Sequence, residues 1–353
     1  MKIVVLGGGI STERQVSLVT AVSVCKALRS LGHRAVFVDM YLGLEDTEGD
    51  LEALFDAPDG LCPEVTIGHA APDLEAVKNS RKWKSSSRIG KNVLEICTLA
   101  DCVFLGLHGE DGEDGKIQAA LELMGIPYTG SGPVPSGMAM DKSIAKKVMH
   151  IFGIPTPQWQ EYDLSCIDRS EILSEQKLPC VVKVVNGGSS IGVYICDTPS
   201  QLRDALEAAV KLNPHIYIEE KKIGREFTVP VLGDRALNAI EIVPPEGAVT
   251  FDYVAKYQNG REGAREICPA DITPEQQKML GDLALRFHRA LGLSVYSRTD
   301  FILDEQGQPW VLEVNTLPGM TPNSLIPRAA KLDGLSYPQL CEKIIALSLN
   351  KQH

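Results

Sequence analysis

The 353-residue sequence lacks the features that direct a chain to a membrane, a secretory route or a nucleic acid. It contains no run of about 18 apolar residues, so we expect no segment to cross a bilayer. Residues 1–9 lack the charged start, long apolar stretch and cleavage site of a signal peptide, and we therefore expect a cytoplasmic protein. The net charge of −11 argues against a nucleic-acid partner, because such a binder needs a basic face.

Cysteine-based metal or disulfide frameworks are also missing. The nine cysteines form neither a Cys-x-x-Cys pair nor a zinc-like cluster. An odd, scattered set in a chain without a signal is typical of reduced cytosolic thiols. The length, with 44% apolar and 23% charged residues, predicts a soluble globular protein of two or three domains.

Two common nucleotide-binding motifs are incomplete. Gly7-Gly8-Gly9 follows a β-branched apolar run, as in dinucleotide-binding folds, but Thr12 stands where the third glycine belongs. Gly115-Lys116 has Glu110 in place of the first glycine of a phosphate-binding loop, and Ile117 replaces its Ser or Thr. Hydride transfer is therefore a poor second hypothesis, and a Walker site is excluded.

The sequence contains the residue pattern of a serine hydrolase, but not the secondary structure that this motif requires. Residues 188–192 match Gly-x-Ser-x-Gly, which would make Ser190 the nucleophile. That motif requires a strand, a sharp turn and then a helix. Residues 193–196 instead have the pattern of a strand, which disfavours a hydrolase.

Hydrophobic patterning predicts an α/β protein. Strands at 2–6 and 35–39 enclose a helix at 13–31, the start of a parallel α/β sheet. A polar, loop-rich insertion follows over 41–92. Further elements are a strand at 101–107 with a helix ending near 124, a helix at 141–152, strands at 179–185 and 191–196, and helices opened by capping boxes at 198–201 and 273–276.

The strongest local signal is a predicted hairpin whose strands cover 295–303 and 310–315. A register that pairs Leu303 with Trp310 places polar side chains of both strands on one face, because residues two apart share a face. On that face we expect Asp300 opposite Glu313 and Arg298 opposite Asn315. On the other face we expect Phe301, Leu303, Leu312 and Val314.

These polar side chains favour a metal site. Two carboxylates and an amide oxygen suit Mg²⁺, which takes few protein carboxylates and leaves its other positions to nucleotide phosphates. The alternative is an exposed face with cross-strand ion pairs and no function. Two adjacent carboxylates would repel each other without a cation, which favours the metal.

A second candidate site is the glycine-rich segment 186–192 between two predicted strands. Glycines let backbone N–H groups approach phosphate oxygens, and Lys183 and Lys142 could supply positive charge. Many hairpins carry Gly and Ser for turn geometry alone, so this motif is weak by itself. His108 lies at the carboxyl end of a predicted strand, where α/β proteins bind ligands, but a structural role in the turn is equally consistent.

Six segments, taken in this order, resemble the D-alanine–D-alanine ligase family of the ATP-grasp superfamily. They cover residues 8–18, 108–118, 187–192, 255–257, 298–300 and 312–324. The resemblance extends from Lys2 to the C-terminus and fails mainly over 41–95.

The resemblance implies three domains in an α/β fold. Residues 1–125 would form a Rossmann-like substrate domain with a parallel sheet. Two ATP-grasp subdomains would follow, a central one at 126–220 with the glycine-rich loop and a C-terminal one at 221–353 with the metal and acceptor site. ATP would lie between the two subdomains.

The resemblance also implies roles for individual residues. The residues for ATP would be Lys142, Lys183 and Lys256 at the phosphates, Ser189 and Ser190 in the loop, and Glu219, Glu220 and Glu226 at adenine and ribose. Asp300, Glu313 and Asn315 would bind two Mg²⁺ or Mn²⁺ ions. The catalytic set would be Glu13, Ser189, Tyr257, Arg298 and Gly319. The D-alanines would be held by Glu13, His108, Ser324 and Leu325.

The implied activity is the ATP-dependent joining of two D-alanines through D-alanyl phosphate, for peptidoglycan precursors. A related ligase that makes D-alanyl-D-lactate or D-alanyl-D-serine is the alternative, since Pro322-Asn323 replaces the usual Ser-His beside the acceptor region. A non-catalytic ATP-grasp relative is a further alternative, disfavoured by the intact set at 298–315. We expect D-alanine and ATP as partners, no nucleic acid or membrane, and a homodimer.

Overall fold

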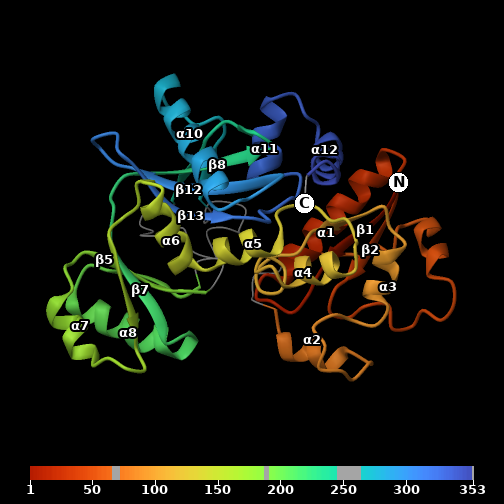
Figure 1. Cartoon of the computed structure of the whole chain (residues 1–353), viewed down its shortest axis with the longest axis horizontal. Helices are drawn as coiled ribbons and strands as arrows, with labels where there is room; N and C mark the ends of the chain where they lie inside the picture. The colour runs from red at the N-terminus through yellow and green to blue at the C-terminus, as the bar shows by residue number, and fades with distance from the viewer. Residues whose placement is uncertain (66–71, 187–190, 245–263, 352–353) are drawn as a thin grey trace.

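The computed structural model describes residues 1–65, 72–186, 191–244 and 264–351, which fold around three β-sheets (Figure 1). The first sheet is parallel, as the sequence predicts, and its strand order is β2-β1-β3. Its elements are β1 (Lys2–Gly7), α1 (Arg14–Ser30), β2 (Arg34–Asp39), β3 (Cys102–Leu105) and α4 (Lys116–Leu123). None of the helices in the described ranges is both long and apolar enough to cross a membrane.

The second sheet is antiparallel, with strand order β4-β7-β5-β6. The predicted strands on either side of the glycine-rich segment are β5 and β6, so the residues after that segment form a strand and no helix. The elements are β4 (Trp159–Asp163), α7 (Arg169–Glu175), β5 (Cys180–Val184), β6 (Val193–Cys196), α8 (Pro199–Leu212) and β7 (His215–Glu220). α8 opens with the predicted capping box at Thr198 and Gln201.

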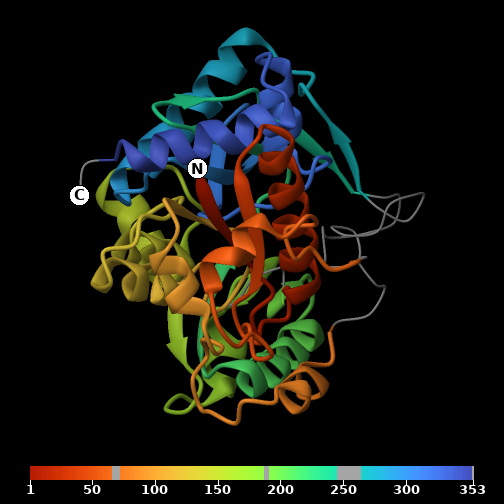
Figure 2. The ribbon, with the colours of Figure 1, turned by 90° about the vertical axis from the view of Figure 1, so that its right-hand side faces the viewer.

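The third sheet is also antiparallel, with the path β11-β10-β8-β12-β13 and β9 paired with β8. Its elements are β8 (Arg225–Leu232), β9 (Arg235–Ala236), β10 (Ile240–Val243), β11 (Arg265–Ile267), α10 (Pro274–Ala290), β12 (Tyr296–Leu303), β13 (Pro309–Asn315), α11 (Leu325–Leu332) and α12 (Tyr337–Leu349). α12 packs against α1, so the end of the chain returns to the first sheet (Figure 2).

Two helices connect the first and second sheets, α5 (Pro133–Met140) and α6 (Lys142–Ile151). The insertion over 41–92 is loop-rich where it is described, as predicted, with only η1 (Leu51–Asp56) and α2 (Leu74–Ser80), and α3 (Val93–Thr98) follows it. Arg81 holds this segment together: it is 2% exposed, stacks on Tyr41 and Trp83, and donates to the carbonyl of Ser87 at 2.6 Å. The segment reaches the acidic turn after β3 through Arg88 and Asp111.

The predicted hairpin register is confirmed at its polar pairs and wrong beyond them. Arg298 pairs with Asn315, and Asp300 with Glu313. A β-bulge then shifts the register by one residue, so Leu303 pairs with Pro309 instead of Trp310. Because of the bulge Val311 is fully buried, whereas Leu312, expected on the apolar face, is partly exposed.

The first two glycines of the triplet at the end of β1 serve close packing. A Cβ on Gly7 would lie 2.4 Å from the Cβ of Ala21 on α1, and Gly8 has φ +72 with the Asp39 carboxylate against it. Asp39, which imitates the ribose-binding acid of a dinucleotide fold, is buried and forms an ion pair with Arg14 at 2.5 Å.

We therefore predict that Gly7→Ala lowers the free energy of unfolding by roughly 1–2 kcal/mol, because α1 must move away from β1. Thermal or denaturant unfolding would measure the change. Gly32→Ala is not a suitable control, since Gly32 has φ +86, whereas Gly132→Ala is, because its nearest contact lies at 3.5 Å and its φ is -71. A loss at position 132 equal to that at position 7 would contradict the packing explanation.

Candidate active site

The paired carboxylates lie side by side on β12 and β13, as the register requires. The Thr228 hydroxyl of β8 donates to Oδ1 of Asp300 at 2.5 Å. Arg298 approaches both oxygens of Asp300 at 3.2 Å, and Asn315 Nδ2 lies 3.5 Å from Oδ2. Asp300 is thus fixed from two neighbouring strands, with Glu313 directly opposite it.

The chemistry of this donor set fits Mg²⁺ or Mn²⁺. Within the described part of the chain, no three side chains of His, Cys, Asp or Glu come together in the way a protein-only metal cage would require. A magnesium ion needs no such cage, because it completes its shell with phosphate and water oxygens. The Glu313 side chain is 31% exposed, so its carboxylate stays accessible to an ion that arrives with a nucleotide.

Lys142 and Lys183 converge on the same region from the second sheet and its connecting helix. Lys142 begins α6, and its N–H donates to the carbonyl of Val185, which ties the helix start to the end of β5. Its Nζ lies 3.8 Å from Oε2 of Glu313. Burial lowers the pKa of Lys183, but Glu219, Tyr217 and Glu313 outweigh burial and raise that pKa above its ordinary value. Positive charge on β5 and α6 therefore faces negative charge on β13.

Glu219 on β7 bridges two buried lysines. Its Oε1 lies 2.5 Å from Lys183 Nζ, and its Oε2 lies 2.6 Å from Lys146 Nζ. Burial alone would raise the pKa of Glu219, but the two ammonium groups outweigh it and hold that pKa below its ordinary value. The carboxylate therefore stays charged although it is only 2% exposed.

Lys146 and Tyr217 are members of this cluster that the sequence reasoning missed. Lys146 is 1% exposed and donates to Thr156 at 2.6 Å. It lies one helical turn after Lys142 on the same face, a spacing that could have identified it. Tyr217 lies two residues before Glu219 on the same face of β7, with Lys183 Nζ 5.8 Å from its ring centre.

The first sheet contributes Glu13 and His108, which lie together. The hydroxyl of Ser11 accepts from the N–H of Glu13 at 3.2 Å and donates to the carbonyl of His108 at 2.7 Å. Burial lowers the pKa of His108, although Glu13 acts in the opposite sense. The imidazole is therefore neutral at physiological pH, with Nε2 3.1 Å from the hydroxyl of Thr20.

The predicted acceptor residues lie at the start of α11. Ser324 is its N-cap residue and Leu325 its first helical residue. The Ser324 hydroxyl accepts from the N–H of Thr321 at 3.0 Å, and a Cβ on Gly319 would lie 3.1 Å from it. Gly319 and the helix start thus form one compact turn after β13.

Not all predicted ATP residues come together. Glu220 lies on the opposite side of β7 from Glu219, is exposed, and pairs with Lys222 at 2.8 Å. Glu226 lies on β8, paired in the sheet with Ile302 and Ile242. Ser189, Ser190, Lys256 and Tyr257 lie outside the described residues, so their roles stay predictions.

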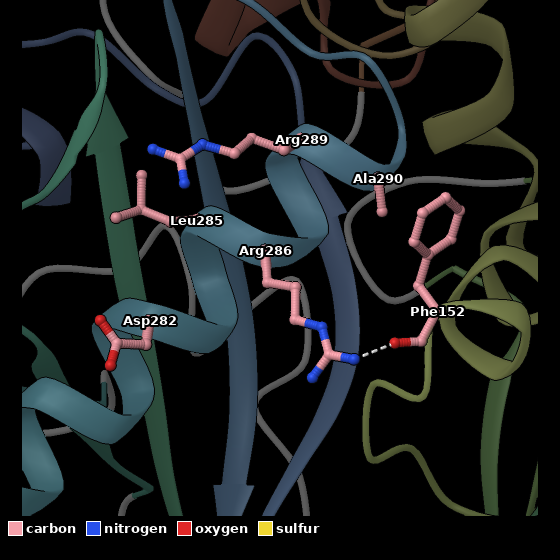
Figure 3. Close-up of a pocket in the computed structure, with 6 residues that line it drawn as sticks. All are labelled: Phe152, Asp282, Leu285, Arg286, Arg289 and Ala290. Carbon is pink, nitrogen blue, oxygen red and sulfur yellow. Dashed lines mark hydrogen bonds between the residues drawn. The ribbon is translucent and has the colours of Figure 1, made fainter.

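A cavity of about 420 Å³ lies against α10, apart from the residues described above (Figure 3). Arg286 donates across it to the carbonyl of Phe152. None of the predicted site residues lines it; the lining consists of Phe152, Asp282, Leu285, Arg286, Arg289 and Ala290. We assign it no part in the chemistry.

A parallel sheet followed by two antiparallel sheets, one presenting lysines and the other carboxylates, defines the ATP-grasp class of proteins. The family model described as D-ala D-ala ligase N-terminus matches residues 2–131, and the one described as D-ala D-ala ligase C-terminus matches residues 148–346. The chain belongs to the D-alanine–D-alanine ligase family.

Individual relatives are similar to this chain over nearly its whole length. The D-alanine–D-alanine ligase of Pediococcus pentosaceus is 40% identical over 346 residues, with 98% of this chain and 97% of the relative covered. That of Lacticaseibacillus casei is 38% identical, with 98% and 95% covered. A crystal structure of the Bacillus anthracis ligase complexed with ATP is similar with a TM-score of 0.71 and 30% identity, covering 99% of this chain and 97% of that one.

Proposed function

We propose that this chain uses ATP to condense two D-alanines into D-alanyl-D-alanine, releasing ADP and phosphate, in the cytoplasmic synthesis of peptidoglycan precursors. The observation that carries the proposal is the convergence of Lys142 and Lys183 on the paired carboxylates Asp300 and Glu313. Family membership and the ATP complex of a relative support it. We further propose that residues 1–125, 126–220 and 221–353 act as the three domains, and that the chain forms a homodimer.

The first half of the reaction activates a carboxylate, which is a poor electrophile. Transfer of the γ-phosphoryl group of ATP to the first D-alanine gives D-alanyl phosphate and ADP. Phosphoryl transfer depends mainly on positioning and on neutralising charge, and Lys142, Lys183 and Lys256 would serve this role. Asp300, Glu313 and Asn315 would hold two Mg²⁺ or Mn²⁺ ions, which supply further positive charge at the phosphates.

In this scheme Glu219 acts by holding Lys146 and Lys183 in place. Both of its oxygens are occupied by ammonium groups, so it fixes Lys183 beside the phosphate site. Glu226, which is partly exposed on β8, would contact the ribose. Glu220 would approach the nucleotide only at the outer side of β7, where Lys222 holds it.

The second half forms the peptide bond. The neutral amine of the second D-alanine attacks the acyl phosphate, and the oxyanion that develops needs donors already in place. Arg298 and the N–H of Gly319 would supply them. Glu13, in a network with Ser189 and Tyr257 and beside neutral His108, would hold the ammonium of the first D-alanine. Ser324 and Leu325 would receive the carboxylate of the second.

The test is a coupled assay of ADP release with D-alanine, D-lactate and D-serine as acceptors, with mass spectrometry of each product. Release of ADP that depends on D-alanine, with D-alanyl-D-alanine as the product, is the expected result. ATP binding without ADP release for any acceptor would instead identify a non-catalytic relative.

We predict that the peptide, and not the ester, dominates when D-alanine and D-lactate compete at equal concentration. A lactate-using site gains from a cationic residue that repels the ammonium of D-alanine, particularly below neutral pH. A tyrosine side chain is never a cation, so Tyr257 provides no such repulsion. Competition at pH 6 and pH 8 with product masses resolved measures the ratio. Predominant D-alanyl-D-lactate at both pH values would contradict the assignment of D-alanine as the second substrate. It would favour the alternative of a D-alanyl-D-lactate ligase, which the unusual Pro322-Asn323 pair suggests.

A further inference from the structure

Glu113 has a buried carboxylate that contacts two different parts of the molecule. Its Oε2 accepts from the N–H of Gly109 at 2.8 Å, and its Oε1 accepts from the N–H of Leu317 at 3.4 Å. Gly109 belongs to the turn after β3 of the first sheet, whereas Leu317 follows β13 of the third. Glu113 is 9% exposed, so water is a poor substitute for either N–H.

The first contact fixes the backbone beside Glu13. Gly109 has φ +73, and a Cβ built on it would lie 3.0 Å from Oε2 of Glu13 and 3.3 Å from Oγ of Ser11. The turn therefore packs directly against the carboxylate that, in the proposed function, holds the first substrate. A shift of Gly109 would change the space next to Glu13.

The second contact fixes the segment that follows the metal hairpin. Leu317 lies two residues after Asn315 and two before Gly319, where β13 has ended and its ladder hydrogen bonds no longer hold the chain. The backbone of Leu317 also hydrogen-bonds with His108. Two side chains of the turn after β3 thus hold the backbone that leads to the proposed oxyanion donor.

We infer that Glu113 is a positioning residue that couples the first-substrate pocket at Glu13 to the oxyanion loop at Gly319. The inference rests on the proposed function. Attack on the acyl phosphate requires substrate and oxyanion donor in one fixed geometry, and a misplacement of about 1 Å can cost 100-fold in rate. One carboxylate shared by both loops keeps that geometry constant.

The electrostatics connect the ionised form of Glu113 to substrate binding. Burial, together with the nearby charge of Glu13, raises the pKa of Glu113 to about 8, while the two N–H groups and Arg298 act in the opposite sense. The ammonium of a first substrate beside Glu13 would offset that like charge. Substrate binding would then favour the ionised form, which accepts from both N–H groups.

The experiment compares E113Q with E110Q. The amide of E113Q has one acceptor oxygen and turns its NH₂ group toward one of the two N–H donors, so that contact is lost. Glu110 lies on the same turn, but its side chain is 61% exposed, and its partners among the described residues are Arg88 and Lys116, both in ion pairs. E110Q therefore replaces a carboxyl group of the same turn by an amide and leaves the bridge in place.

Two readouts test the coupling. Hydrogen exchange of the ligand-free protein should become faster in E113Q at both 108–112 and 316–321, and stay unchanged in E110Q. In the same variant kcat for ADP release should fall roughly 10- to 100-fold, while the affinity for a non-hydrolysable ATP analogue stays unchanged. Faster exchange in only one segment, or an unchanged kcat, would overturn the inference.

Two controls separate this inference from other failures. If E113Q does not fold, the same measurements on E113D decide, because its shorter side chain keeps the charge but cannot reach both N–H groups. If the unmodified protein makes no D-alanyl-D-alanine, the proposed function fails, whereas the exchange result still reports whether Glu113 joins the two loops.

Discussion

Asp300→Asn is expected to reduce ADP release at least about 1,000-fold while leaving the fold intact. The substitution keeps the size of the side chain and its contact with Thr228, but it removes the charge that a cation at the phosphates requires. A loss of this size corresponds to roughly 4 kcal/mol of transition-state stabilisation. Glu313→Gln should have an effect of the same order, because Glu313 lies directly opposite Asp300.

The measurement is steady-state ADP release at saturating D-alanine over a range of Mg²⁺ concentrations. Glu305→Gln is the matched control, because it removes one carboxylate from the exposed turn of the same hairpin. Its rate should equal that of the unmodified protein. If Asp300→Asn also kept near-native turnover at saturating Mg²⁺, the hairpin would be structural and the metal assignment would fail.

The hairpin shows what sequence patterning can and cannot supply. The alternation of polar and apolar residues was enough to place Asp300 opposite Glu313, because one face is buried and a slip by one residue would invert it. The bulge next to that pair was not predictable. It changes which residue of β13 faces the core, so that Val311 instead of Leu312 takes the buried position.

The lysine cluster shows a different limit. Lys142 and Lys183 were identified from the sequence as partners of the glycine-rich segment, but their relation to Glu219 depends on the pairing of β5 with β7. Lys183 pairs with Tyr217 and Val181 with Glu219, a register that strand alternation alone does not fix. The family resemblance assigned both Glu219 and Glu220 to the nucleotide. In the structure they lie on opposite faces of β7, because side chains alternate along a strand.

Glu113 was missed for a related reason. It lies inside a turn with four acidic residues and several glycines, where a carboxylate usually faces solvent. Its burial follows from the return of the chain after β13, some 200 positions later in the sequence. Contacts between such distant segments leave no periodic signal.

Glu219→Gln is expected to lower the free energy of unfolding by roughly 3–5 kcal/mol. Removing one partner of a buried ion pair leaves the other charge without compensation, and here Lys146 and Lys183 are both left. The glutamine keeps the shape of the side chain, so the loss reports charge and not packing. Glu220→Gln is the matched control: it is the adjacent residue, its side chain is 52% exposed, and its pair with Lys222 should contribute about 1 kcal/mol or less.

The loss from Glu219→Gln should depend on pH with a defined sign. Because the folded protein holds the pKa of Glu219 below its ordinary value, the stabilising contribution is complete above the unfolded pKa of about 4.3 and disappears as the pH falls through the folded value. The difference between the two proteins should therefore be largest at neutral pH and shrink in acid. Urea unfolding followed by tryptophan fluorescence measures it, since Trp159 lies 5.7 Å from Lys146 Nζ. A difference that stays constant from pH 7 to pH 3 would mean that packing, and not the charge of Glu219, holds the two lysines in place.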